Sequence, residues 1–122
     1  MVQTPIGTLD TAKAYLRVDS ADEDASIGIL LKSAEQMAMD VARLSQDEWE
    51  TIQKVTTDDD GNVLTIHTRK LKPAEIIQMR ELLRVAILYA VAYLYEHREE
   101  ADHHGLVLTL RNLLFAIREG VL

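Results

Sequence analysis

The sequence contains no cysteine among its 122 residues. Disulfide bonds, zinc sites built on thiolates and thiol nucleophiles are therefore excluded, and cysteine usage says nothing about the redox compartment. Aromatic residues make up only 5% of the chain, with a single tryptophan, and acidic residues outnumber basic ones by 20 to 13. The resulting formal charge of −7 argues against a protein that grips nucleic acid through a broad basic face. It is compatible with a surface past which DNA slides.

No apolar run reaches the length of about 20 residues that a membrane-spanning helix needs. The longest one lies within Leu82–Tyr95, where the stretch from Val85 to Tyr95 has neither a charge nor an amide. It belongs to a helical segment that opens at residues 72–75 and closes on the ionisable residues 96–100. A helix that is apolar on all sides must be covered inside a core or between subunits. We therefore expect a soluble protein built around one central helix, with no membrane association.

The length fits one domain that buries its own core, without support from metals or disulfides. The first residues show no basic region followed by an apolar run and a small-residue cleavage site, so we expect no export signal and synthesis in the cytoplasm. No internal repeat or low-complexity run interrupts the chain. We expect a single domain over residues 1–122.

Helical spacing of apolar residues predicts further helices around the central one. Thr8 is a candidate cap for a short helix over residues 9–17, and Asp19 or Ser20 for a second helix that ends near Arg43. The apolar stripe of that second helix is Ile27, Leu30, Leu31, Ala34, Met37, Ala38 and Val41. Gly28 lies within it, where we expect another backbone to approach closely. A last helix follows Gly105 and carries Leu106, Leu110, Leu113, Leu114 and Ile117.

The pattern changes in residues 45–71. Ser45 and Glu48 form a capping-box pattern for a short helix that carries Trp49 and Ile52. Residues 54–57 and 63–68 then alternate like strands, with a turn signal at 59–62. A lone hairpin is marginally stable in water, so this one should lean on the body or on a neighbouring subunit. The predicted fold is mainly α: a small helical bundle around a long central apolar helix, with a β-hairpin or extended insertion between helices 2 and 3.

Acidic and histidine residues gather after the central helix. Glu96, Glu99 and Asp102 are at helical spacing, and all-helical nucleotide pyrophosphohydrolases hold Mg²⁺ through such carboxylates. That class needs a second acidic pair, whose spacing Glu35 and Asp40 do not reproduce, so a solvated helix end is the favoured interpretation. A further cluster, made of His97, His103, His104 and Glu100, could bind a transition metal. An exposed, unoccupied cluster is favoured there too.

Two more patterns have simple structural explanations. Asp58, Asp60 and Asn62 resemble the start of a calcium loop, but Gly61 is misplaced and the closing glutamate is missing, which favours a plain turn. Tyr89, Tyr93 and Tyr95 could stack on a planar ligand, although a buried aromatic seam is commoner. No serine-histidine-acid arrangement and no glycine-rich phosphate loop occurs, so we predict neither catalysis nor a cofactor.

The order of the motifs resembles a known family. The opening reads Leu9-Asp10-x-x-Lys13-x-x-Leu16-Arg17-Val18-Asp19, followed by Asp22-Glu23-Asp24 and a helix of the form Ile-x-x-Leu-Leu-x-x-Ala-Glu. The second half reads Leu83-Arg84-x-Ala86-Ile87-Leu88-x-x-Val91-Ala92-x-Leu94-Tyr95-Glu96-x-Arg98-Glu99. Both halves, in this order, resemble the head-tail connector proteins of tailed bacteriophages, whose central helix typically ends in a Tyr-Glu-x-Arg-Glu signature. The resemblance covers nearly the whole chain except residues 45–71.

The resemblance implies a structural protein of the virion neck. Such connectors form a ring of about a dozen subunits beneath the portal protein, which closes by a repeated head-to-tail contact. DNA passes through the ring without sequence-specific binding, and a tail-side connector or stopper protein docks on the other side. The alternative is the small all-α metal-dependent nucleotide pyrophosphohydrolase. Candidate subunit or partner contacts in the insertion are Trp49, because tryptophan is enriched at binding hot spots, and Asp59, Asp60, Asn62 and Ile66 around the predicted turn.

Overall fold

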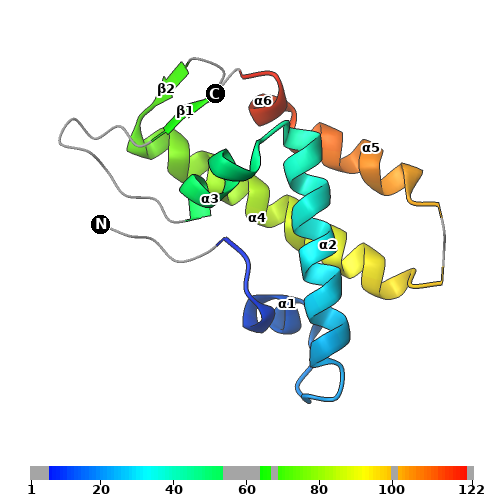
Figure 1. The fold of residues 1–122 in the computed structure, drawn as a ribbon. Helices are drawn as coiled ribbons and strands as arrows, with labels where there is room; N and C mark the ends of the chain where they lie inside the picture. Colours follow the sequence, from blue (N-terminus) through cyan, green and yellow to red (C-terminus); the bar gives the residue numbers. More distant parts are fainter. Residues whose placement is uncertain (1–5, 54–63, 67–68, 100–101, 121–122) are drawn as a thin grey trace.

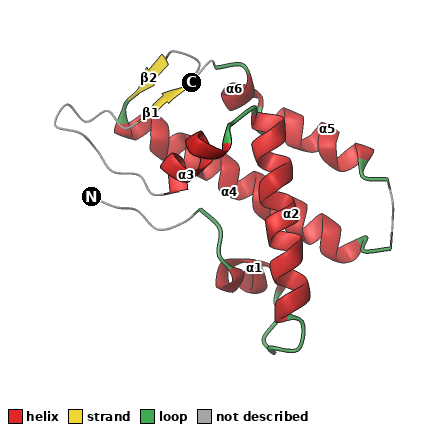
Figure 2. Ribbon diagram, in the orientation of Figure 1, coloured by secondary structure: helices red, strands yellow, loops and turns green. Residues whose placement is uncertain are grey.

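The computed structural model describes residues 6–53, 64–66, 69–99 and 102–120 (Figure 1). They form six helices and two short strands: α1 (Leu9–Leu16), α2 (Asp24–Ala42), α3 (Gln46–Gln53), β1 (Leu64–Ile66), β2 (Arg69–Leu71), α4 (Pro73–Glu96), α5 (His104–Leu113) and α6 (Phe115–Arg118). Figure 2 shows the predominance of helix. The prediction of a mainly α protein is confirmed.

The long helix α4 is the centre of the fold, as predicted. Pro73 occupies its first turn, where the missing N–H costs no hydrogen bond, and the helix ends at Glu96. In Figures 1 and 2, α2 crosses α4, while α1 and α5 lie on either side of the crossing. The side of α4 that meets these helices is fully covered: Ile76, Met79, Leu83, Ala86, Ile87, Ala90 and Val91. From α2 the core receives Ile27, Leu31, Ala34 and Ala38, which confirms the predicted stripe.

The opposite side of α4 is not covered. Ile77 and Val85 are 50% and 53% exposed, and Tyr89 is 38% exposed. The expectation that this helix is covered on all sides is therefore not met within one subunit, because α2 and its neighbours all pack on the same side. Among the described residues, no helix is both long enough and apolar enough to cross a membrane.

The local signals at the helix starts are mostly confirmed. The Thr8 hydroxyl accepts a hydrogen bond from the Thr11 N–H at 3.1 Å. Ser45 and Glu48 form the predicted capping box, in which each side chain accepts from the other residue's N–H, at 2.9 and 3.1 Å. The predicted cap of α2 is wrong, since Ser20 instead accepts from the Asp22 N–H in a turn and the helix begins at Asp24.

The prediction for Gly28 is also wrong. A side-chain carbon built at this glycine would meet no atom within 4 Å, so no other backbone approaches α2 there. The position is an ordinary place on the outer half of a helix. Its glycine has no packing role within one subunit.

The strands differ from the predicted hairpin. Residues 54–63, which include the first predicted strand and its turn, lie outside the described residues. The structure instead pairs β1 with β2 as antiparallel neighbours, with Leu64 opposite Leu71 and Ile66 opposite Arg69. Of the strand expected over 63–68, residues 64–66 form β1, and their described partner is the chain that follows. The predicted pairing of 54–57 with 63–68 lies outside the described residues. The difference arises because alternation predicts strands without specifying which ones pair.

Two arginines hold helix ends in place across the fold. The buried Arg80 of α4 donates to the carbonyl oxygens of Ile52 and Gln53 at the end of α3. Arg118 of α6 donates to the carbonyl oxygen of Val41 near the end of α2, at 3.1 Å. The last carbonyls of a helix have no partner within it, and the helix dipole favours positive charge at this end. Both side chains therefore cap a helix that precedes them by many residues in the sequence.

Candidate interaction surfaces

A polar cluster joins the end of α4 to the start of α2. The Tyr95 hydroxyl donates to one carboxylate oxygen of Glu23 at 2.6 Å, and Arg98 donates to the other at 3.0 Å. The Arg98 guanidinium also lies over the Tyr95 ring, 4.6 Å from its centroid. We call this trio the Glu23 clamp. It gives a structural role to the tyrosine and the arginine of the Tyr-Glu-x-Arg-Glu pattern.

The clamp shifts the titration of its members. The hydrogen bond from Tyr95, followed by that from Arg98, lowers the pKa of Glu23 below its usual 4.5. The same hydrogen bond to Glu23 raises the pKa of the Tyr95 hydroxyl above its usual 10.0. The clamp is therefore favoured with Glu23 ionised and Tyr95 protonated, which is the state at neutral pH.

The tyrosines of α4 do not form one continuous stripe. Tyr93 is half-buried and stacks on His97, with ring centroids 4.1 Å apart, while His103 meets the Tyr93 ring edge-on at 6.0 Å. Tyr89 instead faces outward. The Tyr93 surroundings fit the predicted aromatic seam, whereas Tyr95 belongs to the clamp.

The structure does not bring together the residues of the two metal sites considered in the sequence analysis. Because α4 ends at Glu96, Glu99 and Asp102 do not continue its face, and Asp102 instead accepts from the His104 N–H at the start of α5. His97 is turned toward the carbonyl of Tyr93. Among the described residues, which leave out Glu100, no three acidic or histidine residues could hold a metal ion together.

Trp49, a predicted subunit or partner contact, is buried within its own subunit. Helix α3 folds back on the body and brings Trp49 and Ile52 into the core, with Trp49 only 7% exposed. The tryptophan is thus a packing anchor within one subunit. Of the other predicted contacts, Ile66 lies in β1 opposite Arg69, while Asp59, Asp60 and Asn62 fall outside the described residues.

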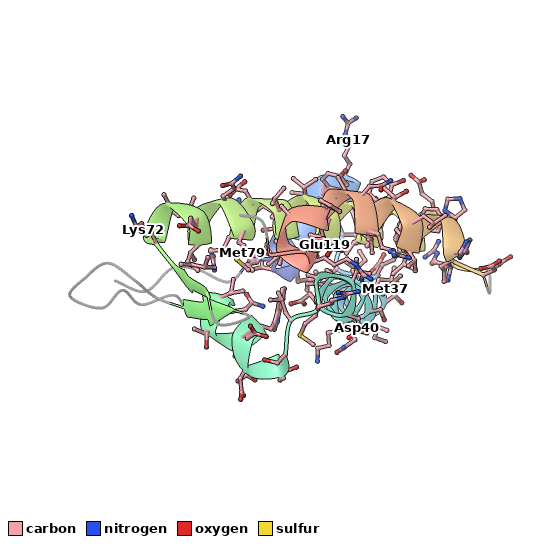
Figure 3. All side chains as sticks on the ribbon, turned by 90° about the horizontal axis from the view of Figure 1, so that it is seen from above. Arg17, Met37, Asp40, Lys72, Met79 and Glu119 are labelled. Carbon is pink, nitrogen blue, oxygen red and sulfur yellow. The ribbon has the colours of Figure 1, made fainter. Side chains whose placement is uncertain are left out.

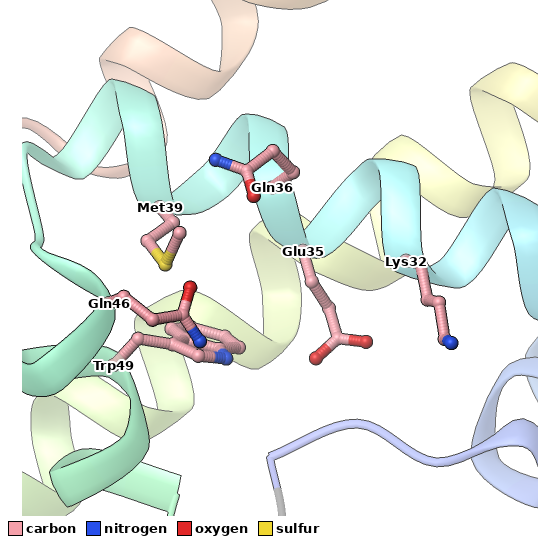
Figure 4. Close-up of a pocket in the computed structure, with 6 residues that line it drawn as sticks. All are labelled: Lys32, Glu35, Gln36, Met39, Gln46 and Trp49. Atoms are coloured by element: carbon pink, nitrogen blue, oxygen red, sulfur yellow. The ribbon is translucent and has the colours of Figure 1, made fainter.

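An open groove of about 300 Å³ lies beside Trp49, between α2 and α3. Its lining is Lys32, Glu35, Gln36, Met39, Gln46 and Trp49. Figure 4 shows Trp49, Gln46 and Met39 at one end and Lys32 at the other, with the Glu35 carboxylate directed into the space between them. The groove thus combines an aromatic wall with a carboxylate.

Glu35 is the chemically distinctive residue of this groove, and the sequence analysis considered it only as a possible metal ligand. It accepts one hydrogen bond, at 3.3 Å, from the side-chain amide of Gln53, whose Oε1 accepts from the Ile6 N–H at 2.8 Å. Burial raises the pKa of Glu35 above its usual 4.5, although the hydrogen bond from Gln53 opposes the shift. No ion pair joins it to Lys32 within the described part of the chain.

Two sides of the molecule are therefore available for contact. Figure 3 shows Arg17 projecting from the side where α4 lies, and Asp40 and Met37 on the opposite side, on α2. The first side carries the exposed face of α4. The second carries the groove and α3, whose sequence holds three acidic residues and no basic one.

The comparisons with known proteins agree with this architecture. A family model described as phage gp6-like head-tail connector protein matches residues 6–120. No curated protein and no solved structure matches the chain significantly. The family match covers α1 to α6, including the segment of residues 45–71 that the sequence resemblance had left out.

Proposed function

Because the chain belongs to the phage gp6-like head-tail connector family, we propose that its subunits assemble into a ring beneath the portal protein. The family is one of structural connectors and not of enzymes, which supports a position at the junction of head and tail. The observation that carries the proposal is the extent of the match, from residue 6 to residue 120. In the proposed ring, genomic DNA passes through the central channel and the assembled ring is part of the virion neck.

The surfaces described above support a repeated head-to-tail contact. A ring of identical subunits uses two different surfaces on each subunit, and it closes when the rotation between neighbours divides a full turn. In Figure 3, Arg17 and α4 lie toward one side of the subunit, while α2, which lines the groove, lies toward the other, so the subunit has two different surfaces for such a contact. The apolar residues Val85 and Tyr89 remain uncovered in one subunit, and a ring would cover them.

The charge of the chain suits a conduit for DNA. With 20 acidic and 13 basic residues, a ring of these subunits is strongly negative. Like charges lower the tendency to form tight contacts with phosphates, because such contacts depend on lysine and arginine displacing counterions. DNA would then slide without being held.

The proposed partners are the portal protein on the head side and a tail-side connector or stopper protein on the other. We propose that the segment of residues 45–71 contributes to these contacts or to those between subunits, with Trp49, Asp59, Asp60, Asn62 and Ile66 as candidates. Since Trp49 is buried, its contribution would be to hold α3 in position.

The test is the absolute mass of the protein by light scattering after size exclusion, alone and mixed with the portal protein, with negative-stain images of the large species. We expect closed rings of roughly ten or more subunits, formed alone or on the portal. A protein that stays monomeric or dimeric in both conditions would contradict the proposal. The nucleotide hydrolase interpretation is not retained, because the family is structural and Glu96, Glu99 and Asp102 do not share a helix face.

A further inference from the structure

The groove beside Trp49 has the chemistry of a site for a cationic side chain. The Glu35 carboxylate points into it, accepts a single hydrogen bond, and has no ion-pair partner among the described residues. Trp49 and Met39 supply an aromatic and a polarisable wall, while Gln36 and Gln46 add amide groups. An arginine fits such a lining best, because its planar guanidinium both packs on aromatic rings and pairs with carboxylates.

Few arginines of the described chain are free to fill such a groove in another copy. Arg80, Arg84, Arg98 and Arg118 already have partners within the subunit. Arg17, Arg43 and Arg111 are exposed, and their side chains make no hydrogen bond or ion pair among the described residues. Of the arginines whose side chains the structure describes, which leave out Arg69, these three are the candidates.

The positions of these three arginines in the fold indicate which one could reach the groove of another copy. Arg43 follows α2 directly and precedes α3, so it borders the groove of its own subunit. Arg111 belongs to α5, which packs against both α2 and α4 and so lies at an edge between the two sides. Arg17 ends α1 in a left-handed conformation (φ 61°) and projects from the side opposite the groove (Figure 3). Only Arg17 is placed for a contact that repeats from one copy to the next in the same direction.

We propose that Arg17 of one copy seats in the α2–α3 groove of a second copy, with its guanidinium beside Trp49 and paired with Glu35. This inference rests on the proposed ring and identifies the contact that builds it. The charges agree in sign, since α3, which forms one wall of the groove, holds three acidic residues and no basic one, while Arg17 is a cation that projects from the side of α4. In Figure 3, α4 lies toward the side from which Arg17 projects, and its exposed apolar residues would enlarge the contact.

Cross-linking tests the contact directly, because the chain has no cysteine of its own. The test variant carries Ala14→Cys, on the exposed surface of α1 one turn before Arg17, together with Gln36→Cys at the groove. A short bismaleimide reagent is applied at high protein concentration and on the portal. A head-to-tail contact links each copy to two others, so the double variant should give a ladder of covalent multimers, while either single variant stops at dimers. The matched control pairs Gln36→Cys with Asn112→Cys on α5 and should give no ladder.

A second experiment tests the chemistry of the anchor. Arg17→Gln should weaken association by roughly 30-fold, as loss of an interface hot spot does, and Arg17→Lys should restore only part of it. Because the exposed Arg17 side chain makes no hydrogen bond or ion pair with the described residues of its own subunit, circular dichroism and the melting temperature should not change. Arg111→Gln, on a side chain equally free, serves as the control and should assemble normally.

The outcomes separate this inference from the proposed function. Rings that form without a covalent ladder from the double variant would overturn the Arg17 contact and leave the ring standing. A ladder from a protein that never closes rings or binds portal would support the contact and contradict the proposed function. Normal association of Arg17→Gln would overturn the anchoring role, whatever the cross-linking shows.

Discussion

At the scale of single residues, Glu35 is the clearest case of a side chain that does not serve the stability of its own subunit. Burial raises its pKa, so the folded subunit binds the Glu35 proton more tightly than the unfolded chain does. This contribution to stability is complete below the usual value of 4.5 and is lost as the pH rises through the higher folded value. At neutral pH the ionised Glu35 therefore lowers the stability of the single subunit relative to a neutral side chain. Pairing with a cation of a second copy would offset this loss.

We predict that Glu35→Gln raises the melting temperature of the unassembled subunit at neutral pH. The glutamine carbonyl can still accept from Gln53, and it carries no charge to be desolvated. The gain over wild type should shrink toward about pH 3.5, where Glu35 itself is protonated. Thermal melts of both proteins across this range measure it. A gain that is the same at every pH would show that the charge is not its origin.

Gly28 offers an independent test of the packing. It lies inside α2, and an added side-chain carbon would meet no atom within 4 Å. Gly28→Ala should therefore stabilise the subunit by about 0.5–1 kcal/mol through the lower entropy of the unfolded chain and the better helix propensity of alanine. Chemical denaturation measures the change. A loss of stability would mean that another part of the chain approaches α2 more closely than the structure shows.

At the scale of the elements, the Glu23 clamp connects two helices whose ends are far apart in sequence. Tyr95 and Arg98 lie at and just beyond the end of α4, and both reach the residue that precedes α2. The lowered pKa of Glu23 stabilises the fold above the usual value of 4.5, and this contribution is lost as the pH falls through the folded value. The raised pKa of Tyr95 contributes below its usual 10.0 and is lost as the pH rises through the folded value.

We predict that Tyr95→Phe lowers the melting temperature only within a window of pH. The phenylalanine keeps the ring beneath Arg98 and removes the hydroxyl that Glu23 accepts from. The difference from wild type should be largest between roughly pH 5 and 9 and should fade at both extremes, where Glu23 is protonated or Tyr95 is ionised. Melting curves over that range measure it. Tyr89→Phe, on an exposed hydroxyl of the same helix, is the control and should show no such window.

The elements also show what could be predicted from the sequence. Helix starts could be predicted from local signals, because each signal acts on backbone groups within one turn. The examples are Thr8, the Ser45–Glu48 box and Pro73. The predicted start of α2 was wrong because several polar residues near Ser20 are equally suitable as caps.

Arrangements that depend on residues far apart in the sequence could not be predicted from the sequence. The pairing of β1 with β2 depends on neighbours that alternation does not specify. The burial of Trp49 depends on α3 folding back, which Arg80 fixes from α4, and the partner of Tyr95 and Arg98 depends on α2 crossing α4. The groove around Glu35 is likewise a product of two packed helices.

At the scale of the whole molecule, the subunit is covered unevenly. The helices that pack on α4 bury one set of its residues and leave Val85 and Tyr89 exposed. Apolar residues exposed together on a helix face are typical of a surface that meets a partner. The sequence predicted that the central helix must be buried on all sides. Within one subunit, only part of its surface is buried.

We predict that Val85→Glu leaves the subunit folded and prevents its assembly. The side chain is 53% exposed, so the change in the free energy of unfolding should stay within about 0.5 kcal/mol. In the assembled ring the same glutamate would be buried without a partner, and association should weaken by at least about tenfold. Light scattering with and without portal measures assembly, and denaturation measures folding. Leu108→Glu, on an apolar residue of α5 that is 46% exposed and lies outside both proposed surfaces, is the matched control. Assembly that survives Val85→Glu but fails with Leu108→Glu would move the subunit contact from α4 to α5.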